Sequence, residues 1–305
     1  MPWMQMTLTT NENQVDSVGD AMLALGALSV TLMDAEDVPI LEPAPGETPL
    51  WDQVKMMFLF DMAIDPKQVL HQWQLNSLAK QTDHIKFELL EDKDWEREWM
   101  ERFEPMRFGQ RLWICPSWKP LVDPAAVNIL LDPGLAFGTG THPTTALCLE
   151  WLDSIDLKGK TLIDYGCGSG ILAIAALKLG ASKVVAVDID PQALIATREN
   201  ASRNQIDMQK LVVDYPEKLP DEAVDIVIAN ILAGPLKELS NIITKHCKIN
   251  GQIALSGILD TQAEETRKVY QRSFDMESIS YKNEWSRLVG TKIHSTQQNQ
   301  PWSMS

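Results

Sequence analysis

Asp164-Tyr165-Gly166-Cys167-Gly168-Ser169-Gly170 is the stretch of sequence that decides the fold of this chain. The strand-like residues 160–163, Lys-Thr-Leu-Ile, precede it, and the apolar run 171–177 follows it. A strand, a glycine-rich turn and an apolar helix in that order predict a turn at the carboxyl edge of a parallel sheet. Glycine at alternate positions allows positive φ and lets a ligand approach bare backbone. Taken alone, the same pattern also fits a tight turn that binds nothing.

The chain is long enough, at 305 residues, for two domains or for one domain with a large extension. No stretch approaches the ~20 continuous apolar residues that span a bilayer, and the N-terminus lacks the pattern of a signal peptide. The four cysteines, at 115, 148, 167 and 247, are scattered and never form a C-x-x-C pair. This spacing argues against disulfides and against a structural zinc site, so we expect no metal and a cytoplasmic location.

The formal net charge of −15 bears on the choice of partner. Such a surface repels phosphate backbones, so we expect no direct nucleic-acid specificity. Residues 1–89 contain thirteen Asp or Glu and four Lys, a formal balance of −9. This acidic segment is either a solvated surface that keeps the protein soluble or a docking face for a basic partner.

Residues 1–90 show alternating strand and helix patterns. We expect strands at 3–9, 27–33, 54–61 and 84–90. One helix should begin at a cap formed by Asn11 or Asn13 and run to about Leu25, with apolar residues at helical spacing. A second should begin at Asp65-Pro66 and run to about Leu78. The order β-α-β-β-α-β predicts a small α+β domain of the ferredoxin-like type.

Residues 91–103 are dense in charge and read as a connecting helix. Trp95 and Trp99 lie four residues apart, on one face of that helix. Packing against a neighbouring domain accounts for this pair, and a stacking platform for a nucleic-acid base is the alternative.

The rest of the chain alternates between apolar strands and helices. We expect strands at 112–115, 127–131, 161–164, 184–188, 211–214, 224–229 and 252–256, and an antiparallel hairpin of 274–281 with 287–293 around the turn Asn283-Glu284. Helices should occupy 143–152, 171–179 and 191–204, with further helices between the later strands. Continuous apolar strands alternating with helices predict a parallel sheet covered on both faces, a Rossmann-like α/β fold.

Two acidic residues end strands next to the glycine turn. Asp188 ends the strand that follows it, where a carboxylate can accept from both hydroxyls of a ribose. Helix capping ahead of Pro191 fits Asp190 better than Asp188. Asp214 ends the next strand, near the expected position of the base, although it also fits an ordinary turn residue before Pro216.

The spacing of the glycines separates two classes of cofactor. A dinucleotide site requires Gly-x-Gly-x-x-Gly with a pyrophosphate at the helix N-terminus. Here the spacing is Gly-x-Gly-x-Gly, and the preceding Asp164 would repel a phosphate. An acid at this position suits a ligand with a cationic ammonium group, which favours S-adenosylmethionine over NAD.

Several motifs carry a resemblance to a known family. The glycine turn, Val187-Asp188-Ile189-Asp190-Pro191 and Ala229-Asn230-Ile231-Leu232 resemble the successive motifs of class I S-adenosylmethionine-dependent methyltransferases. The unusual run 131–145, LDPGLAFGTGTHPTT, together with 230–236, NILAGPL, resembles the bacterial methyltransferases of large-subunit ribosomal protein eleven. The resemblance extends over nearly the whole chain except the polar C-terminal tail. It implies methylation of lysine side chains and of the N-terminal α-amine of that ribosomal protein.

The resemblance assigns cofactor contacts to Thr145, Gly166, Asp188 and Asn230. We add Asp164 and Gly168 from the glycine turn, Asp214, and Phe137 as part of a cover over the cofactor. No catalytic residue is assigned firmly, and Asn230 and His142 are the candidates. A histidine before a proline at a helix start is more often structural, so both interpretations of His142 stay open.

The resemblance also implies a division of labour along the chain. We expect a substrate-recognition domain at 1–90, a connecting helix at 91–104, a methyltransferase domain at 105–294 and a polar tail at 295–305. We expect a monomer that needs no membrane. The main alternative is a methyltransferase acting on ribosomal RNA bases, but Asn230-Ile231-Leu232-Ala233 lacks the two prolines and the aromatic residue typical of that class. A non-enzymatic scaffold with a vestigial site is a second alternative.

Overall fold

A computed structural model describes residues 3–36, 48–90, 103–132 and 142–294. The chain divides into two compact units, Met1–Glu101 and Arg102–Ser305. No helix within the described ranges is long and apolar enough to cross a membrane. The predicted connecting helix with Trp95 and Trp99, the segment around Phe137 and the polar tail lie outside the described residues.

The first unit is a four-stranded antiparallel sheet with two helices. Its strand order is β2-β3-β1-β4, which confirms the ferredoxin-like prediction. The elements are β1 (Trp3–Asn11), α1 (Val15–Ala24), β2 (Ser29–Asp34), β3 (Gln53–Phe60), α2 (Pro66–Leu75) and β4 (Asp83–Leu90).

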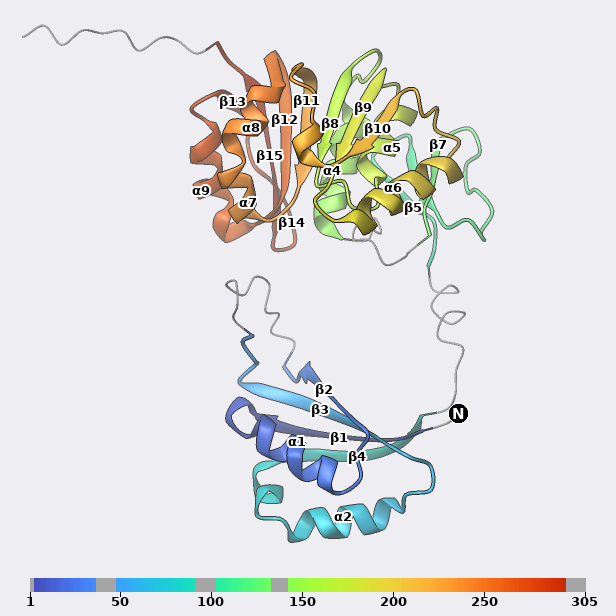
Figure 1. The fold of residues 1–305 in the computed structure, drawn as a ribbon, viewed down its shortest axis with the longest axis vertical. Coiled ribbons are helices and arrows are strands. Elements are labelled where there is room, and N and C mark those ends of the chain that lie inside the picture. Colours follow the sequence, from blue (N-terminus) through green and yellow to red (C-terminus); the bar gives the residue numbers. More distant parts are fainter. Residues whose placement is uncertain (1–2, 37–47, 91–102, 133–141, 295–305) are drawn as a thin grey trace, which may run out of the picture. The chain divides into compact units, whose positions relative to one another are not determined.

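One face of this sheet forms a core with both helices. Met6 of β1 and Phe58 of β3 are fully buried, together with Met22 of α1 and Trp73 of α2. Alternate residues of each strand point to the same face, which is why both helices gather on that side (Figure 1). The predicted start of α2 is confirmed, since the Asp65 side chain accepts a hydrogen bond from the Lys67 N–H.

The predicted cap of α1 is wrong. A 3-10 turn, Glu12–Gln14, separates β1 from α1, and neither Asn11 nor Asn13 caps the helix with its side chain. Strand β1 continues to Asn11, which pairs with Gln53 of β3. Pairing with a distant strand therefore keeps Asn11 in the sheet, and a rule based on neighbouring residues alone does not include that pairing.

The second unit is built on a large mixed sheet in the order β10-β9-β8-β11-β12-β15-β13, with β14 paired to β15. Its strands are β8 (Thr161–Tyr165), β9 (Lys183–Val187), β10 (Leu211–Asp214), β11 (Val224–Asn230), β12 (Cys247–Leu259), β13 (Phe274–Met276), β14 (Ser280–Lys282) and β15 (Trp285–Lys292). Its helices are α4 (Pro143–Ser154), α5 (Ile171–Lys178), α6 (Pro191–Arg203), α7 (Ala233–Glu238), α8 (Ser240–His246) and α9 (Asp260–Tyr270).

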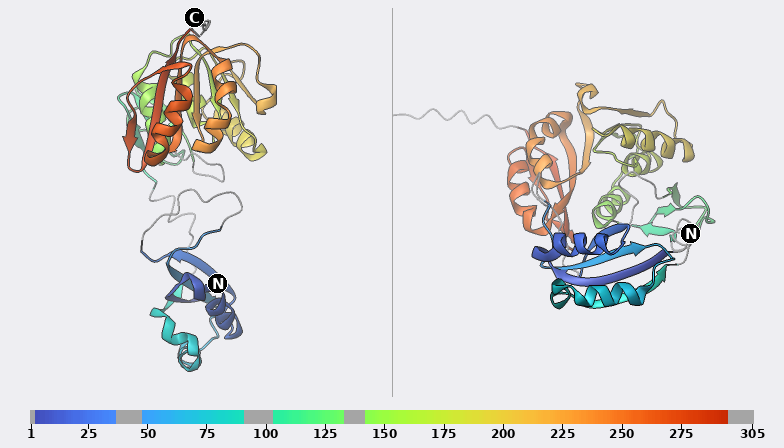
Figure 2. Two further views of the ribbon diagram at one scale, coloured as in Figure 1. Left: turned by 90° about the vertical axis from the view of Figure 1, so that its left-hand side faces the viewer. Right: turned by 60° about the horizontal axis from the view of Figure 1, so that its bottom comes forward.

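Helices cover both faces of this sheet, which confirms the Rossmann-like prediction. Figure 1 shows α7, α8 and α9 on one side of the sheet and α5 and α6 on the other, and Figure 2 shows the two layers from other directions. Leu162 of β8 joins the core beneath α4–α6, whereas its neighbour Ile163 joins the core beneath α7–α9. The central parallel strands β8, β9 and β11 are mostly apolar because both of their faces are buried.

Strand β8 lies where the order of the parallel strands reverses. It pairs with β9 on one side and with β11 on the other. In open α/β sheets, ligands bind outside the carboxyl ends of the strands at such a reversal. The glycine turn follows β8 directly, so the topology places it at this crevice.

A small sheet precedes α4 in the chain. It consists of β5 (Met106–Phe108), which the sequence analysis missed, β6 (Leu112–Cys115) and β7 (Val127–Leu130). The buried carboxylate of Asp153 on α4 accepts hydrogen bonds from the Gln110 N–H at 2.6 Å and from Arg111 Nε at 3.2 Å. These bonds fasten the β5–β6 turn to the end of α4.

The predicted strand 274–281 is interrupted. It divides into β13 and β14, both antiparallel to β15, which begins at Trp285 rather than at Arg287. The two short strands pair with opposite ends of β15, because Phe274 faces Lys292 and Lys282 faces Trp285. Ser280 lies four positions after Met276, whereas their partners Arg287 and Gly290 are three positions apart, so a one-residue shift in register breaks the pairing between β13 and β14.

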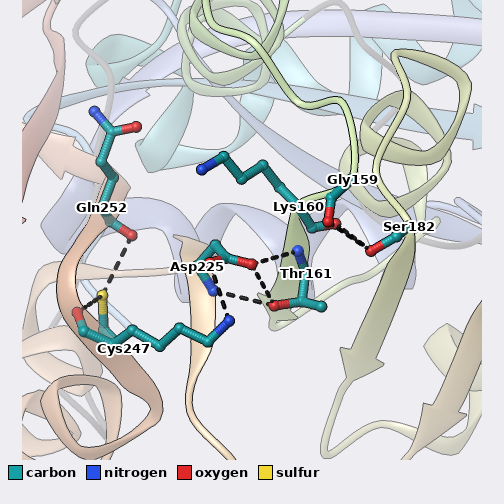
Figure 3. Close-up of polar contacts among 8 residues, drawn as sticks. Gly159, Lys160, Thr161, Ser182, Asp225, Cys247 and Gln252 are labelled. Atoms are coloured by element: carbon teal, nitrogen blue, oxygen red, sulfur yellow. Dashed lines mark hydrogen bonds and ion pairs between the residues drawn. The ribbon is translucent and has the colours of Figure 1, made fainter.

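Asp225 connects three strands at the amino edge of the large sheet. One of its carboxylate oxygens accepts from the backbone N–H and the hydroxyl of Thr161, at 2.9 and 2.8 Å. The other accepts from Lys248 Nζ at 3.0 Å. Figure 3 shows the carboxylate of Asp225 turned toward Thr161. Burial raises the pKa of Asp225, but these hydrogen bonds together outweigh it and lower the pKa to about 2.

We expect Asp225→Asn to destabilise the protein near neutral pH and to lose that effect in acid. The pKa of Asp225 lies below the ~3.9 of an unfolded chain, so the carboxylate stabilises the fold fully above about pH 4. This contribution disappears as the pH falls from about 4 towards about 2. Partial exposure limits the loss at neutral pH to about 1 kcal/mol.

Urea unfolding of wild type and variant across this pH range measures the effect. Asp221→Asn is the matched control, because it removes a surface ion pair with Lys245 whose aspartate side chain is 95% exposed. Equal free energies of unfolding for wild type and Asp225→Asn at neutral pH would contradict the prediction.

Candidate active site

The glycine turn has the backbone conformation that its sequence suggests. Gly166, Gly168 and Gly170 have φ of 77°, 53° and 77°, in the left-handed region. The N–H groups of Gly166 and Cys167 both donate to the carbonyl of Val187 at the end of β9, at 2.8 and 3.0 Å. The turn is therefore held against the neighbouring strand, at the carboxyl edge of the sheet.

Helix α6 supports the turn from behind. The hydroxyl of Thr197 donates to the Gly168 carbonyl at 3.0 Å, and Asn200 Nδ2 donates to the Ser169 carbonyl at 2.8 Å. A Cβ on Gly170 would lie 2.7 Å from the methyl group of Thr197, so only glycine fits there. The sequence analysis missed Thr197 and Asn200. The sequence feature that could have indicated them is a pair of polar residues three positions apart on the face of α6 that packs against the sheet.

Asp188 lies beside the glycine turn, as its strand-end position predicts. Its Oδ2 accepts from the Gly168 N–H at 2.9 Å, and its Oδ1 accepts from the Asp190 N–H at 3.0 Å. Asp190, rather than Asp188, caps α6 by accepting from the Gln192 N–H at 2.8 Å. Each oxygen of the Asp188 carboxylate keeps a further lone pair for a ligand hydroxyl.

Asp164 is completely buried near the end of β8. Its Oδ2 accepts from the Ala173 N–H at 3.0 Å, while its Oδ1 has no hydrogen-bond partner among the described residues. Burial raises the pKa of Asp164 to about 7; the Ala173 bond opposes this and the charge of Asp188 adds to it. A buried carboxylate with one unsatisfied oxygen is a strong acceptor for a cationic ligand group.

Thr145 and Asn230 come together from elements far apart in the sequence. Asn230 ends β11, and its Nδ2 donates to Thr145 Oγ1 at 3.4 Å. Thr145 lies in the first turn of α4 and is 1% exposed. This contact brings Thr145 and Asn230 together at the same edge of the sheet as the glycine turn.

His142 is placed as the residue that begins α4. Its Nδ1 accepts from the Thr144 N–H at 3.4 Å, and its ring meets Trp285 edge-on with centroids 4.9 Å apart. Partial burial lowers the pKa of His142, which keeps the ring neutral near pH 7. These contacts support the structural interpretation, and a catalytic role stays a prediction. Phe137 lies outside the described residues.

Asp214 ends β10 as predicted, but its carboxylate already has partners. It accepts from the Tyr215 N–H at 2.9 Å and forms an ion pair with Lys218 at 2.9 Å. The hydrogen bond from Lys218 is the main reason that the pKa of Asp214 is lowered. This arrangement supports the turn-residue interpretation, and a contact between Asp214 and a base stays a prediction.

Ile231 links the two strand ends of the site, and the sequence analysis missed it. A Cβ on Gly166 would lie 2.3 Å from Ile231 Cγ2, and a Cβ on Gly257 would lie 2.4 Å from the Ile231 carbonyl oxygen. Gly257 has φ of 81° and interrupts the apolar run of β12. A glycine inside a strand pattern indicates close backbone approach, which is the signal that was available.

These residues fit S-adenosylmethionine, the cofactor that the sequence resemblance implies. The free oxygen of Asp164 suits the ammonium group of the methionine part. The lone pairs of Asp188 suit the ribose hydroxyls. Within the described residues, no group of three or more His, Cys, Asp or Glu could hold a metal ion.

Comparisons with known proteins identify the family. The family model described as ribosomal protein L11 methyltransferase (PrmA) matches residues 2–293. A ribosomal protein L11 methyltransferase of Vibrio cholerae serotype O1 (strain M66-2) is 54% identical over 295 residues, covering 96% of this chain and 100% of the relative. One of Aliivibrio fischeri (strain MJ11) is 53% identical over 294 residues, with the same coverage.

A solved structure shows the same likeness. The ribosomal protein L11 methylase of Lactobacillus delbrueckii subsp. bulgaricus is 33% identical, with a TM-score of 0.58. The match covers 63% of this chain and 100% of the solved chain. The family model and the near-full-length relatives lead to one conclusion: the chain belongs to the ribosomal protein L11 methyltransferase family and is a methyltransferase that uses S-adenosylmethionine.

Proposed function

We propose that this enzyme methylates amines of ribosomal protein L11, both lysine side chains and the N-terminal α-amine. The main support for this proposal is the hydrogen bond between Asn230 and Thr145, which places both residues beside the glycine turn. The buried carboxylate of Asp164 directly precedes that turn. The names of the relatives support ribosomal protein L11 as the substrate. We place the activity in the cytoplasm, with the enzyme acting as a monomer.

The proposed site residues divide into two groups. Gly166, Gly168, Asp164 and Asp188 hold the cofactor together with Thr145 and Asn230, and Asn230 also faces the reacting amine. When bound, S-adenosylmethionine supplies an electrophilic methyl group on its sulfonium. Holding the amine in line with that methyl group accounts for several kcal/mol of the barrier.

The amine must lose its proton before it reacts, because a lysine with a pKa of ~10.4 is mostly charged near pH 7. Desolvation in a site whose walls are buried lowers that pKa. The bond from Asn230 Nδ2 to Thr145 fixes the orientation of the Asn230 amide. The carbonyl oxygen of Asn230 is then the acceptor that orients an N–H of the neutral amine. No dedicated general base is required when deprotonation precedes docking.

We also propose that the unit Met1–Glu101 recognises the substrate protein. Its acidic balance over residues 1–89 attracts a basic partner. Its helices cover only one face of its sheet; the other face carries Lys55 and Lys86, so the acidic residues elsewhere on this unit supply the attraction. Two separate units allow the catalytic unit to reach several amines of one bound target.

Mass spectrometry tests the proposed function directly. The protein is incubated with labelled S-adenosylmethionine, unmodified ribosomal protein L11 and ribosomal RNA, and the labelled atoms are then identified. Label on lysine side chains and on the N-terminal amine is the expected result. Label on RNA with none on protein would establish the nucleic-acid alternative and overturn the proposal.

We predict that the affinity for S-adenosylmethionine depends on pH through the ionisation of Asp164. Because the folded pKa of about 7 lies above the ~3.9 of an unfolded chain, ionising Asp164 costs stability in the free enzyme as the pH rises towards 7. A cationic ammonium favours the ionised carboxylate. Affinity for S-adenosylmethionine should therefore rise with pH through about 7. The Asp164→Asn variant should bind S-adenosylmethionine at least about tenfold more weakly, and its affinity should not change with pH in this range.

Calorimetric titration between about pH 5.5 and 8.5 measures this behaviour. S-adenosylhomocysteine, which keeps the ammonium but lacks the sulfonium charge, controls for general electrostatics. A wild-type affinity that does not change over this pH range would contradict the assignment of Asp164 to the ammonium.

A further inference from the structure

The β14–β15 hairpin forms a second pocket in the catalytic unit. Asp260, Thr261, Tyr281 and Asn283 line this open pocket, which has a volume of about 380 Å³. None of these four residues belongs to the cofactor site described above. All four are exposed, and the side chain of Tyr281 is the large aromatic surface among them.

The sheet places this pocket at the same edge as the active site. Strand β12 runs parallel to β11, with Ser256 level with Asn230, and Asp260 begins α9 directly after β12 ends at Leu259. The Asp260 N–H donates to the Glu284 carbonyl in the hairpin turn at 2.9 Å. The pocket therefore lies just beyond the carboxyl end of the strand next to Asn230.

A second set of contacts ties the hairpin to the active-site residues. Trp285, the first residue of β15, packs against the ring of His142. His142 begins α4, the helix whose first turn carries Thr145. The hairpin therefore contacts the N-terminus of α4, the same part of the helix that carries Thr145. Glycine-turn residues lie at the end of β8, on the other side of β11, so the pocket is on the side away from the cofactor residues.

The pocket's lining has the chemistry of a cation site. Asp260 is its only residue with a formal charge; its carboxylate accepts from the Thr261 N–H at 2.6 Å and keeps further lone pairs. Tyr281 supplies an aromatic face, and Asn283 supplies an amide oxygen. The neighbouring cation Lys282 lies on the opposite face of β14, where its Nζ bonds to Glu150 on α4 at 2.7 Å. A carboxylate beside an exposed ring suits an ammonium group with an aliphatic stem.

We propose that this pocket holds the ammonium group of a second lysine of the substrate protein while a neighbouring amine is being methylated. The inference rests on the proposed function, because a protein with several lysines must occupy the site. Asp260 and Tyr281 are specificity-determining residues that act on docking, since they lie outside the Thr145–Asn230 pair. Gripping a second lysine would select targets that carry lysines in clusters over those with an isolated lysine.

Steady-state kinetics of the full-length enzyme tests the proposal. Asp260→Asn and Tyr281→Leu are each expected to raise the KM for ribosomal protein L11 about fivefold, and the double variant about tenfold or more. The kcat at saturating substrate and the Kd for S-adenosylmethionine should stay unchanged. Asp275→Asn is the matched control, because this exposed aspartate on β13 pairs with Thr291, at the opposite end of β15 from the hairpin turn.

A peptide substrate separates a lysine contact from a general effect on structure. A synthetic peptide with two neighbouring lysines is compared with the same peptide in which the second lysine is norleucine. Wild type should prefer the lysine-pair peptide about fivefold in kcat/KM, and Asp260→Asn should not distinguish the two. An unchanged KM in both single variants, or an equal preference in wild type and variant, overturns the inference. Failure of wild type to label any protein overturns the proposed function instead.

Discussion

A chain that begins at Glu91 is expected to bind S-adenosylmethionine as tightly as the full-length protein and to lose at least about 100-fold in kcat/KM for ribosomal protein L11. Every proposed cofactor residue lies in the unit Arg102–Ser305. This unit has two buried cores of its own, one on each face of its sheet. The first unit has a separate core, so its removal opens neither of them.

The size of the loss follows from effective concentration. A docking unit holds the target near the active site at an effective concentration on the order of millimolar, and its removal turns methylation into an encounter of free molecules. Calorimetry measures cofactor binding, and transfer of labelled methyl groups measures activity. Free lysine is the control substrate, because it cannot use the docking unit and should react equally with both chains. Full activity of the shortened chain on ribosomal protein L11 would refute the recognition role of residues 1–90.

The second large effect is expected for Asp188→Ala, with cofactor affinity reduced by about 100-fold or more. Hydrogen bonds to a charged acceptor contribute about 1.5–3 kcal/mol each, and Asp188 is proposed to accept from two ribose hydroxyls. Part of the loss comes from the turn, since the Gly168 N–H also loses its acceptor. The fold should persist because the Asp188 side chain lies outside both buried cores of the unit.

Asp190→Ala is the matched control for this experiment. It removes the side-chain cap of α6, which should cost about 1 kcal/mol of stability, and it leaves the proposed ribose contact in place. Calorimetry with S-adenosylmethionine and thermal unfolding are measured for both variants. The expected pattern is weak binding with near-normal stability for Asp188→Ala and the reverse for Asp190→Ala. Equal cofactor affinity in wild type and Asp188→Ala would remove Asp188 from the site.

The position of Asp188 illustrates what could be predicted from the chain alone. The carboxyl ends of parallel strands share one edge of a sheet, so a residue that ends a strand can be placed without knowing its neighbours. The same rule placed Asp214 and Asn230. The rule is silent on what else each side chain contacts: Asp214 pairs with Lys218, and Asn230 meets Thr145 from a different part of the chain.

The cap of α1 illustrates why local signals fail. Asn11 has the right chemistry for a helix cap, but its backbone belongs to a ladder with Gln53, forty-two positions further along. Pairing over such a distance depends on the whole sheet, which a local pattern does not contain. The interruption of the strand predicted at 274–281 escaped prediction for the same reason, because it arises from a one-residue shift in the pairing with β15 between Met276 and Ser280.

The sequence by itself determined the class of fold, the edge of the sheet that carries the site and the identity of the family. Alternation of apolar strands with helices, glycine spacing and motif order are properties of short segments, so they can be read in the chain. The tertiary structure decided how the site is assembled. It packed Ile231 against Gly166, buried Asp164 until its pKa rose to about 7, and brought Asp260 at the start of α9 and Tyr281 of β14 together beside the active-site edge. Burial and contact between distant segments exist only once the chain has folded, and they set the chemistry of this site.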